Sequence, residues 1–363
     1  MTVETLEVRD FRNLAFQKID IDRKCTLFYG NNGQGKTNIL EAIWLLSCGK
    51  SLRGALDREM VAFGKTSAQV KMYCEDEVRQ IPFEAKLYTD KRKEIFIQNE
   101  KITRNADLLG SLPTVLFVPD NLNMIKGAPE NRRKFLDVSL CQQSKSYFNA
   151  LKEYNKILDG RNVLLKQIAR NEQPADVLDV WDRELAKRGA RISFKRNEYI
   201  EKLMPIAYFD HKELSENKEE MSLLYESFLD ELYDIPSMEE EFYYKLTQTR
   251  TEDIWNGVTS IGCHRDDIEI LLNDISLKKF GSEGQKRSAV ITLKLAEGAI
   301  IEDVMGVRPV FLLDDVLSEL DDKRREYIVS SIKDFQVIIT DCQKSVYKNV
   351  CRYRVENGRV YGE

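Results

Sequence analysis

The sequence predicts an α/β domain that is interrupted by a long helical insertion. Three observations support this prediction. Strand-like patterns and glycine-rich turns around one helix fill residues 1–119. Between residues 120 and 257, apolar residues instead recur every three or four positions, as on one face of a helix. Strand and turn patterns return over 258–363, so we expect 1–119 and 258–363 to form one lobe around an inserted helical lobe, 120–257.

Alternating apolar and polar residues, or short apolar runs between turn residues, predict the strands of the first lobe. These strands are expected at 3–8, 16–21, 25–29, 70–74, 81–87, 95–97, 115–118, 310–314 and 336–340. Helices are expected at 36–48, 285–304 and 321–331. A hairpin over 268–275 is expected to turn at Asn273-Asp274, because these residue types tolerate the backbone of a tight turn.

The insertion is expected to consist of long amphipathic helices. Apolar residues recur at steps of three or four from Phe135 to Ile168, and again from Val177 to Phe209. Each stretch is long enough for several heptads, so an antiparallel helical hairpin is the simplest arrangement.

Composition excludes several classes of protein. The 363 residues include 60 Asp and Glu against 55 Lys and Arg, a net charge of −5, so any nucleic-acid binding must use a local basic patch. The longest apolar runs have four or five residues, whereas a membrane span needs about 20. The first residues also lack the pattern of a secretory signal. The seven cysteines are widely spaced and form no Cys-x-x-Cys, which disfavours disulfides and zinc and favours a reducing cytoplasm. Only two histidines are present, so histidine-based metal or triad chemistry is not expected.

Residues 30–37, Gly-Asn-Asn-Gly-Gln-Gly-Lys-Thr, fit the phosphate-binding pattern G-x-x-x-x-G-K-[ST] and lie between a predicted strand and a predicted helix. Glycines allow the backbone N–H groups to surround phosphates, and the helix N-terminus adds its dipole. Lys36 is expected to reach the β- and γ-phosphates of ATP, and Thr37 to ligate Mg²⁺.

An acidic pair follows the apolar strand predicted at 310–314. Asp314 is expected in the shell of the Mg²⁺ ion, and Asp315 is expected to orient or deprotonate the attacking water. About 280 residues separate Lys36 from Asp314, so something large must lie between the two motifs. The helical stretch accounts for that distance.

Ser282-Glu-Gly-Gln285 opens a predicted helix, a second arrangement suited to binding an anion. It resembles the signature motif of ABC-type ATPases, and residues 318–321 resemble their D-loop. The resemblance implies an ABC-type ATPase head, a P-loop lobe of mixed sheet and helices split by a helical lobe with a short antiparallel hairpin. It also implies that the signature completes the γ-phosphate site of a second subunit, so that ATP joins a homodimer.

Three further segments resemble the RecF family of bacterial repair ATPases: 11–14 (Phe-Arg-Asn-Leu), 126–137 (with Arg-Arg-Lys-Phe-Leu-Asp) and 262–267 (Gly-Cys-His-Arg-Asp-Asp). With residues 30–53, the resemblance runs essentially end to end. It implies a cytoplasmic protein of DNA replication, recombination and repair in the SOS response. Such a protein dimerises on ATP, clamps DNA at single-strand gaps or single-strand/double-strand junctions, hydrolyses ATP weakly with DNA stimulation, and supports RecA loading with a RecR-type mediator.

The resemblance also implies a set of site residues. The nucleotide contacts it implies are Arg12, Asn13, Gly30, Asn31, Asn32, Gly33, Gln34, Gly35, Lys36, Thr37, Asn38, Ser282, Gly284 and Gln285. The catalytic set is Lys36, Asp314, Asp315 and Ser282, with Thr37 and Asp314 holding Mg²⁺. This chain departs from the pattern in two places: Cys263 stands where the family has proline, and Thr340-Asp341 follows the last core strand where ABC transporters have histidine. The second departure leaves the γ-phosphate sensor unassigned.

The resemblance implies that at least one basic surface contacts DNA. Lys187, Arg191 and Lys195 recur every four residues, so they share one helical face. The full set of DNA candidates is Arg132, Arg133, Lys187, Arg188, Arg191 and Lys195, and Arg324 with Arg325 forms a further basic cluster. A solvated helix face remains the alternative for each. No aromatic platform or base-reading module is visible in the sequence, so contacts are expected to go to phosphates regardless of sequence.

Other ABC-class proteins remain alternatives. The ATPase subunit of a membrane transporter would carry histidine after the last core strand and a smaller insertion. An SMC-type scaffold needs hundreds of heptad residues, and only about 140 residues separate the two parts of the lobe here. A scaffold that binds nucleotide without hydrolysing it is disfavoured by the complete set of Lys36, Asp314 and Asp315.

Overall fold

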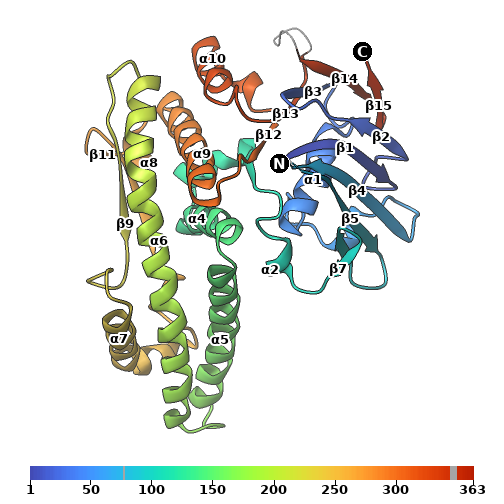
Figure 1. The fold of residues 1–363 in the computed structure, drawn as a ribbon. Helices are drawn as coiled ribbons and strands as arrows, with labels where there is room; N and C mark the ends of the chain where they lie inside the picture. The colour runs from blue at the N-terminus through green and yellow to red at the C-terminus, as the bar shows by residue number, and fades with distance from the viewer. Residues whose placement is uncertain (77, 344–349) are drawn as a thin grey trace. The chain divides into compact units, whose positions relative to one another are not determined.

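The computed structural model describes residues 1–76, 78–343 and 350–363 (Figure 1). They form two compact units, one of residues 1–121 with 291–363 and one of residues 122–290. The predicted lobe boundary is therefore corrected: residues 258–290 belong to the second unit. They do so because β10 (Asp267–Leu272) pairs along its whole length with β9 (Met221–Glu226), a strand inside the predicted insertion.

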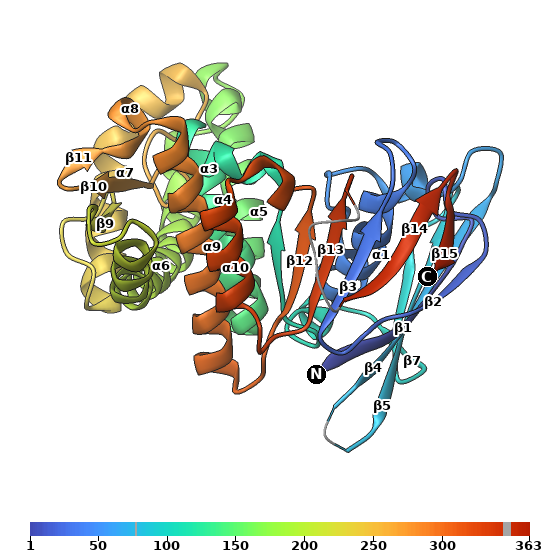
Figure 2. The ribbon, with the colours of Figure 1, turned by 90° about the horizontal axis from the view of Figure 1, so that it is seen from above.

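The first unit contains a mainly parallel sheet with the strand order β15-β14-β3-β13-β12-β8 (Figure 2). Neighbouring strands run parallel from β8 to β14, and β15 is antiparallel to β14. The bounds are β3 (Cys25–Tyr29), β8 (Thr114–Phe117), β12 (Val310–Asp314), β13 (Val337–Asp341), β14 (Cys351–Glu356) and β15 (Arg359–Gly362). Every residue of β12 and β13 is buried, as expected for strands covered on both faces.

A second sheet of the first unit is antiparallel, in the order β2-β1-β4-β5-β6-β7. Its strands are β1 (Thr2–Arg9), β2 (Gln17–Asp20), β4 (Ser67–Glu75), β5 (Gln80–Tyr88), β6 (Glu94–Ile97) and β7 (Glu100–Ile102). Every second residue of β4 and β5 is buried, which is the pattern of a sheet with one covered face. Helix α1 (Lys36–Cys48) contacts strands of both sheets, and its apolar residues are buried on nearly all sides.

The second unit is built around four helices, α4 (Pro129–Gln143), α5 (Lys145–Ala169), α6 (Leu178–Leu214) and α7 (Ile235–Asn256). Helices α5 and α6 form the predicted antiparallel hairpin, and α7 packs against both (Figure 1). A three-stranded sheet, β11 (Ile275–Ser276), β10 and β9, completes this unit. The predicted turn of the β10–β11 hairpin is confirmed, with Asn273 and Asp274 at positive φ.

A buried ion-pair network ties the three long helices of the second unit together. Arg161 of α5 donates from Nε to Asp182 of α6 and from Nη1 to Asp253 of α7, each over 2.7 Å. All three side chains are fully buried. Removing one partner would leave an uncompensated buried charge, so the network fixes how the helices pack.

The remaining α-helices are α2 (Asn105–Leu108), α3 (Asn123–Lys126), α8 (Leu277–Phe280), α9 (Glu283–Met305) and α10 (Asp322–Ser331). The boundary between the two units falls inside α9. In the part of the chain that the structure describes, no helix has both the length and the apolarity needed to cross a bilayer.

Candidate functional site

The phosphate loop (residues 30–37) lies between β3 and α1, as the motif requires. Gly30, Gly33 and Gly35 have φ values of 151°, 77° and 113°, a region that favours glycine. A Cβ on Gly35 would lie 2.6 Å from Asn13 Oδ1, and one on Gly30 would lie 2.3 Å from the carbonyl oxygen of Val355. The chain packs too closely here for any side chain at these two positions.

Lys36 is the first residue of α1, and it is only 4% exposed. Its Nζ donates to the carbonyl oxygen of Gly30 over 2.7 Å and lies 3.8 Å from Asp315 Oδ1. It also lies 3.4 Å from the sulfur of Cys342, whose thiol donates to Asn32 Oδ1 over 2.9 Å. The loop therefore holds a buried positive charge beside a carboxylate and an exposed thiol. No sequence pattern indicated Cys342.

The structure brings Thr37 and Asp314 together across the whole insertion. Thr37 Oγ1 donates to Asp314 Oδ1 over 2.8 Å. Thr340, at the end of the neighbouring strand β13, donates to the same oxygen over 2.7 Å. Hydroxyl and carboxylate oxygens are the ligands that Mg²⁺ prefers, so this donor set fits the ion that the motif predicts.

Asp315 directly follows β12 and has a φ of 51°, in the left-handed region. Its N–H donates to both the carbonyl oxygen and Oγ1 of Thr340, over 3.1 and 3.0 Å. Burial raises the pKa of the Asp315 carboxyl, and the nearby Lys36 ammonium opposes that rise. Thr340 thus holds both acidic residues, a role that the sequence did not indicate. This role of Thr340 follows from strand register, because β12 and β13 are adjacent parallel strands in which Asp314 lies opposite Thr340.

Arg12 lies at the edge of this site, and each of its three guanidinium nitrogens donates one hydrogen bond within the protein. Nε and Nη2 donate to the two carboxylate oxygens of Glu41 over 2.8 and 2.9 Å, and Nη1 donates to the carbonyl oxygen of Glu59 over 2.9 Å. Burial would raise the pKa of Glu41, but hydrogen bonds from Arg12 and Ser51 hold it below its usual value. Arg12 therefore joins the segment after β1 to α1 and to Glu59, and two of its five N–H groups are not used in these bonds.

Asn13 joins the segment after β1 to the phosphate loop. Its Oδ1 accepts from Asn38 Nδ2 over 2.8 Å, and its Nδ2 donates to the carbonyl oxygen of Gln34 over 3.2 Å. The three predicted nucleotide contacts Asn13, Gln34 and Asn38 are therefore gathered in one place.

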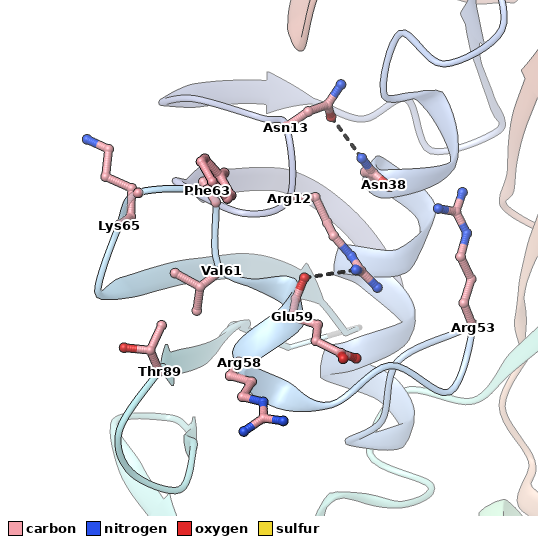
Figure 3. Close-up of a pocket in the computed structure, with 12 residues that line it drawn as sticks. Arg12, Asn13, Asn38, Arg53, Arg58, Glu59, Val61, Phe63, Lys65 and Thr89 are labelled. Carbon is pink, nitrogen blue, oxygen red and sulfur yellow. Dashed lines mark hydrogen bonds between the residues drawn. The ribbon is translucent and has the colours of Figure 1, made fainter.

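A pocket of about 530 Å³ opens beside these asparagines, within the first unit (Figure 3). Arg12, Asn13 and Asn38 line it, together with the cations Arg53, Arg58 and Lys65. The exposed ring of Phe63 stands at the same wall. The sequence prediction did not include Arg58, Phe63 or Lys65, because their proximity to the loop depends on how β1 and β4 pair. Positive charge beside a phosphate loop favours an anionic ligand.

The signature segment (residues 282–285) belongs to the second unit and starts helix α9. Ser282 Oγ accepts from the Gln285 N–H over 3.2 Å, and Gln285 Oε1 accepts from the Ser282 N–H over 2.7 Å. This reciprocal pair is a capping box, so part of the motif serves the helix itself. The Ser282 side chain remains exposed.

Of the adjacent DNA candidates Arg132 and Arg133, Arg132 must be corrected. Arg132 is 3% exposed and makes a bidentate pair with Asp267 over 2.6 and 2.7 Å. Arg133 is partly buried and donates to the carbonyl oxygen of Asp266 over 2.6 Å. The family-specific segments at 126–137 and 262–267 thus bind each other, and Arg132 is not available to a DNA phosphate, whereas Arg133 stays a prediction.

Helix α6 keeps a basic face that is open to solvent. Lys187, Arg191 and Lys195, hereafter the α6 basic face, are exposed. Arg191 lies 3.7 Å from Glu239, and Lys195 lies 2.6 Å from Glu198; such surface pairs are weak. Arg188 is less available, since it pairs with Glu153 and Glu184 over 3.0 and 2.8 Å.

Comparison with known proteins agrees with this geometry. The family described as RecF/RecN/SMC N terminal domain matches residues 2–358. The DNA replication and repair protein RecF of Clostridium kluyveri is 37% identical over 365 residues, and that of Clostridium tetani is 38% identical over 364 residues. Each comparison covers 99% of both chains.

Solved structures extend the comparison to the fold. The recombination mediator protein RecF of the RecFOR pathway, solved as RecF-ATPrS and as RecF-ATP, is 36% identical with a TM-score of 0.94, over at least 99% of this chain and 97% of that chain. An Smc head domain of Pyrococcus furiosus, 17% identical over 99% of this chain and 95% of that chain, has a TM-score of 0.58 and shows the shared fold alone. The predicted ABC-type ATPase head is thereby confirmed, and the chain belongs to the RecF family of DNA replication and repair proteins.

Proposed function

We propose that this chain is an ATP-switched DNA clamp of gap repair. ATP binding drives homodimerisation and clamping at single-strand gaps or single-strand/double-strand junctions, and weak, DNA-stimulated hydrolysis resets the clamp. One observation carries the proposal: Thr37 Oγ1 lies 2.8 Å from Asp314 Oδ1, beside the almost fully buried Lys36. The relatives solved as RecF-ATP and RecF-ATPrS support the choice of nucleotide.

In this proposal, each residue of the site has one task. Lys36 neutralises charge on the β- and γ-phosphates, while Thr37 and Asp314 hold Mg²⁺, which supplies Lewis-acid charge when bound. Asp315 orients the attacking water and accepts its proton, a task that suits a carboxyl whose pKa is raised by burial. The pocket beside Asn13 and Phe63 would receive the base and ribose.

One feature favours slow hydrolysis. Thr340, Asp341 and Cys342 stand where transporter ATPases carry a histidine. In the proposed function, the ATP-bound dimer stays closed on DNA until ATP is hydrolysed, so slow hydrolysis gives the clamp a long lifetime.

Thr340→Val should slow ATP hydrolysis by about ten- to hundredfold. The Asp314 carboxylate loses the hydrogen bond from Thr340 Oγ1, and the Asp315 N–H loses its bond to the same hydroxyl, so neither acidic residue is held in place by that hydroxyl. ATP affinity measured without Mg²⁺ should stay within about twofold of wild type. Thr340→Ser keeps the hydroxyl and should retain most activity. Steady-state ATPase assays with calorimetry test this, and a Thr340→Val enzyme with wild-type turnover would contradict it.

The α6 basic face is the proposed DNA contact. Lys187→Glu with Arg191→Glu should weaken DNA binding equally for all sequences and reduce the slope of log affinity against log salt by about 0.7 to 0.9 per lost phosphate contact. Lys152→Glu with Lys156→Glu is the matched control, since both lysines are exposed and four residues apart on α5. Fluorescence anisotropy over a salt series measures the slope. An unchanged slope would exclude this face.

A nucleotide-gated scaffold of the SMC type, without a gap-repair role, is the alternative function. Size-exclusion chromatography with and without ATP, repeated with duplex and gapped DNA, separates the two. The proposed function predicts an ATP-dependent dimer that prefers gapped DNA, whereas the scaffold predicts no such preference. A RecR-type mediator as partner, and support of RecA loading, belong to the same proposal; the RecFOR pathway named for the solved relative supports it. No membrane partner is proposed.

A further inference from the structure

The end of helix α6 is connected by hydrogen bonds to the start of helix α9, within the second unit. His211, in the last turn of α6, is fully buried, and its Nε2 lies 3.1 Å from Glu219 Oε2. The other carboxylate oxygen, Glu219 Oε1, accepts from Gln285 Nε2 over 2.9 Å. One carboxylate therefore bridges a buried histidine of α6 and the glutamine of the signature segment.

This bridge determines how the Gln285 amide is oriented. An ionised carboxylate only accepts hydrogen bonds, so the amide nitrogen must face Glu219 and the amide oxygen must face away from it. That oxygen accepts from the Ser282 N–H over 2.7 Å. Ser282 Oγ in turn accepts from the Gln285 N–H, so the hydroxyl keeps its own proton for another acceptor.

We propose that Glu219 is a positioning residue of the signature segment, which couples the end of α6 to the Ser282 hydroxyl. The proposal rests on the proposed function, in which Ser282 completes the ATP site of a second subunit. Helix α6 also carries the basic face proposed to bind DNA. If DNA binding moves the C-terminal end of α6, the hydrogen bonds of Glu219 and Gln285 would change the position of Ser282. Glu219 lies outside every motif that the sequence displays.

The backbone around Glu219 is held independently of its side chain. Ser215 Oγ accepts from the Glu219 N–H over 3.1 Å and donates to the Glu219 carbonyl oxygen over 3.3 Å. The neighbouring Glu220 is exposed and pairs with Lys212 over 2.8 Å. Truncating Glu219 therefore removes the bridge and leaves the loop anchored, and Glu220 offers a matched control.

The test compares Glu219→Ala, Glu219→Gln and Glu220→Ala in the full chain. Sedimentation with ATP and with a slowly hydrolysed analogue gives the dimer dissociation constant. Calorimetry gives nucleotide affinity, and thermal melting gives stability. Glu219→Ala should bind ATP within about twofold of wild type but raise the dimer dissociation constant about tenfold, the effect of losing a hydrogen bond to a charged group. Its ATPase activity should recover as protein concentration rises, because only assembly is impaired.

The two comparison variants sharpen the result. Glu219→Gln keeps a carbonyl for Gln285 Nε2, and His211 can present its other tautomer, so dimerisation should stay within about threefold of wild type. Glu220→Ala should match wild type. The proposal would be overturned if Glu219→Ala dimerises as wild type does. It would also be overturned if Glu220→Ala loses dimerisation to the same extent, or if the weaker dimerisation of Glu219→Ala comes with a lower melting temperature and a lower ATP affinity. If wild type itself fails to dimerise with ATP, the proposed function fails first, and this outcome is distinct from a defect confined to Glu219→Ala.

Discussion

Lys36→Ala should lower ATP affinity by about a hundredfold or more. Lys36 supplies the only formal positive charge in the phosphate loop, and it is 4% exposed, so its attraction for a phosphate is weakly screened. Charge-assisted hydrogen bonds contribute about 1.5–3 kcal/mol each, and the ammonium can make more than one to the β- and γ-phosphates. Isothermal calorimetry with ATP and Mg²⁺ measures the loss directly.

Asp315→Asn is the comparison that separates binding from chemistry. Asparagine is nearly the same size and keeps the backbone N–H that bonds to Thr340, but it cannot accept a proton from water. The variant should bind ATP as wild type does, or slightly more tightly, since a negative charge near the phosphates is gone. Its hydrolysis should be slow. Near-normal ATP affinity in Lys36→Ala would refute the assignment of residues 30–37 as the phosphate site.

Much of the first unit was predictable because its signals are local. The alternation in β4 and β5 and the apolar runs of β12 and β13 depend only on which face each residue presents. The phosphate loop is similarly local, since its glycines are required by backbone angles within the loop. Strands β14 and β9 were missed although alternate residues of each are apolar. Both are short, and β9 lies inside a stretch with a helical pattern, so pairing with neighbouring strands decides their conformation.

Charged residues could not be assigned from sequence for a different reason. Arg132 and Arg133 look like a surface cluster, yet Arg132 is buried because Asp267, 135 residues later, neutralises it. Arg12 is predicted as a nucleotide contact, and Glu41 and Glu59 accept three of its five N–H groups, which the sequence does not indicate. Whether a charged side chain is exposed depends on the residues that pair with it, and these residues are distant in sequence and come close only in the folded chain. The same reasoning explains why Thr340 became visible only through strand register.

Ser282→Arg should separate nucleotide binding from dimerisation. The phosphate loop belongs to the first unit and supplies the lysine and the backbone N–H groups for the phosphates, so a monomer should hold ATP without Ser282. In the proposed dimer, the exposed Ser282 caps the γ-phosphate of the other subunit, and a bulky cation blocks both copies of that composite site. The variant should bind ATP near-normally, stay monomeric at ATP concentrations that dimerise wild type, and lose ATPase activity.

The size of this effect follows from linkage. Coupling between nucleotide and partner subunit is reciprocal and typically amounts to about 1–3 kcal/mol per site, so losing it at two sites should weaken the dimer by about 25-fold or more. Ser146→Arg adds the same charge at an exposed serine of α5 and should leave dimerisation unchanged. Sedimentation with a slowly hydrolysed ATP analogue compares the two variants. If Ser282→Arg still dimerises with ATP, residues 282–285 serve only as the capping box of α9, and the ATP-joined dimer has to be abandoned.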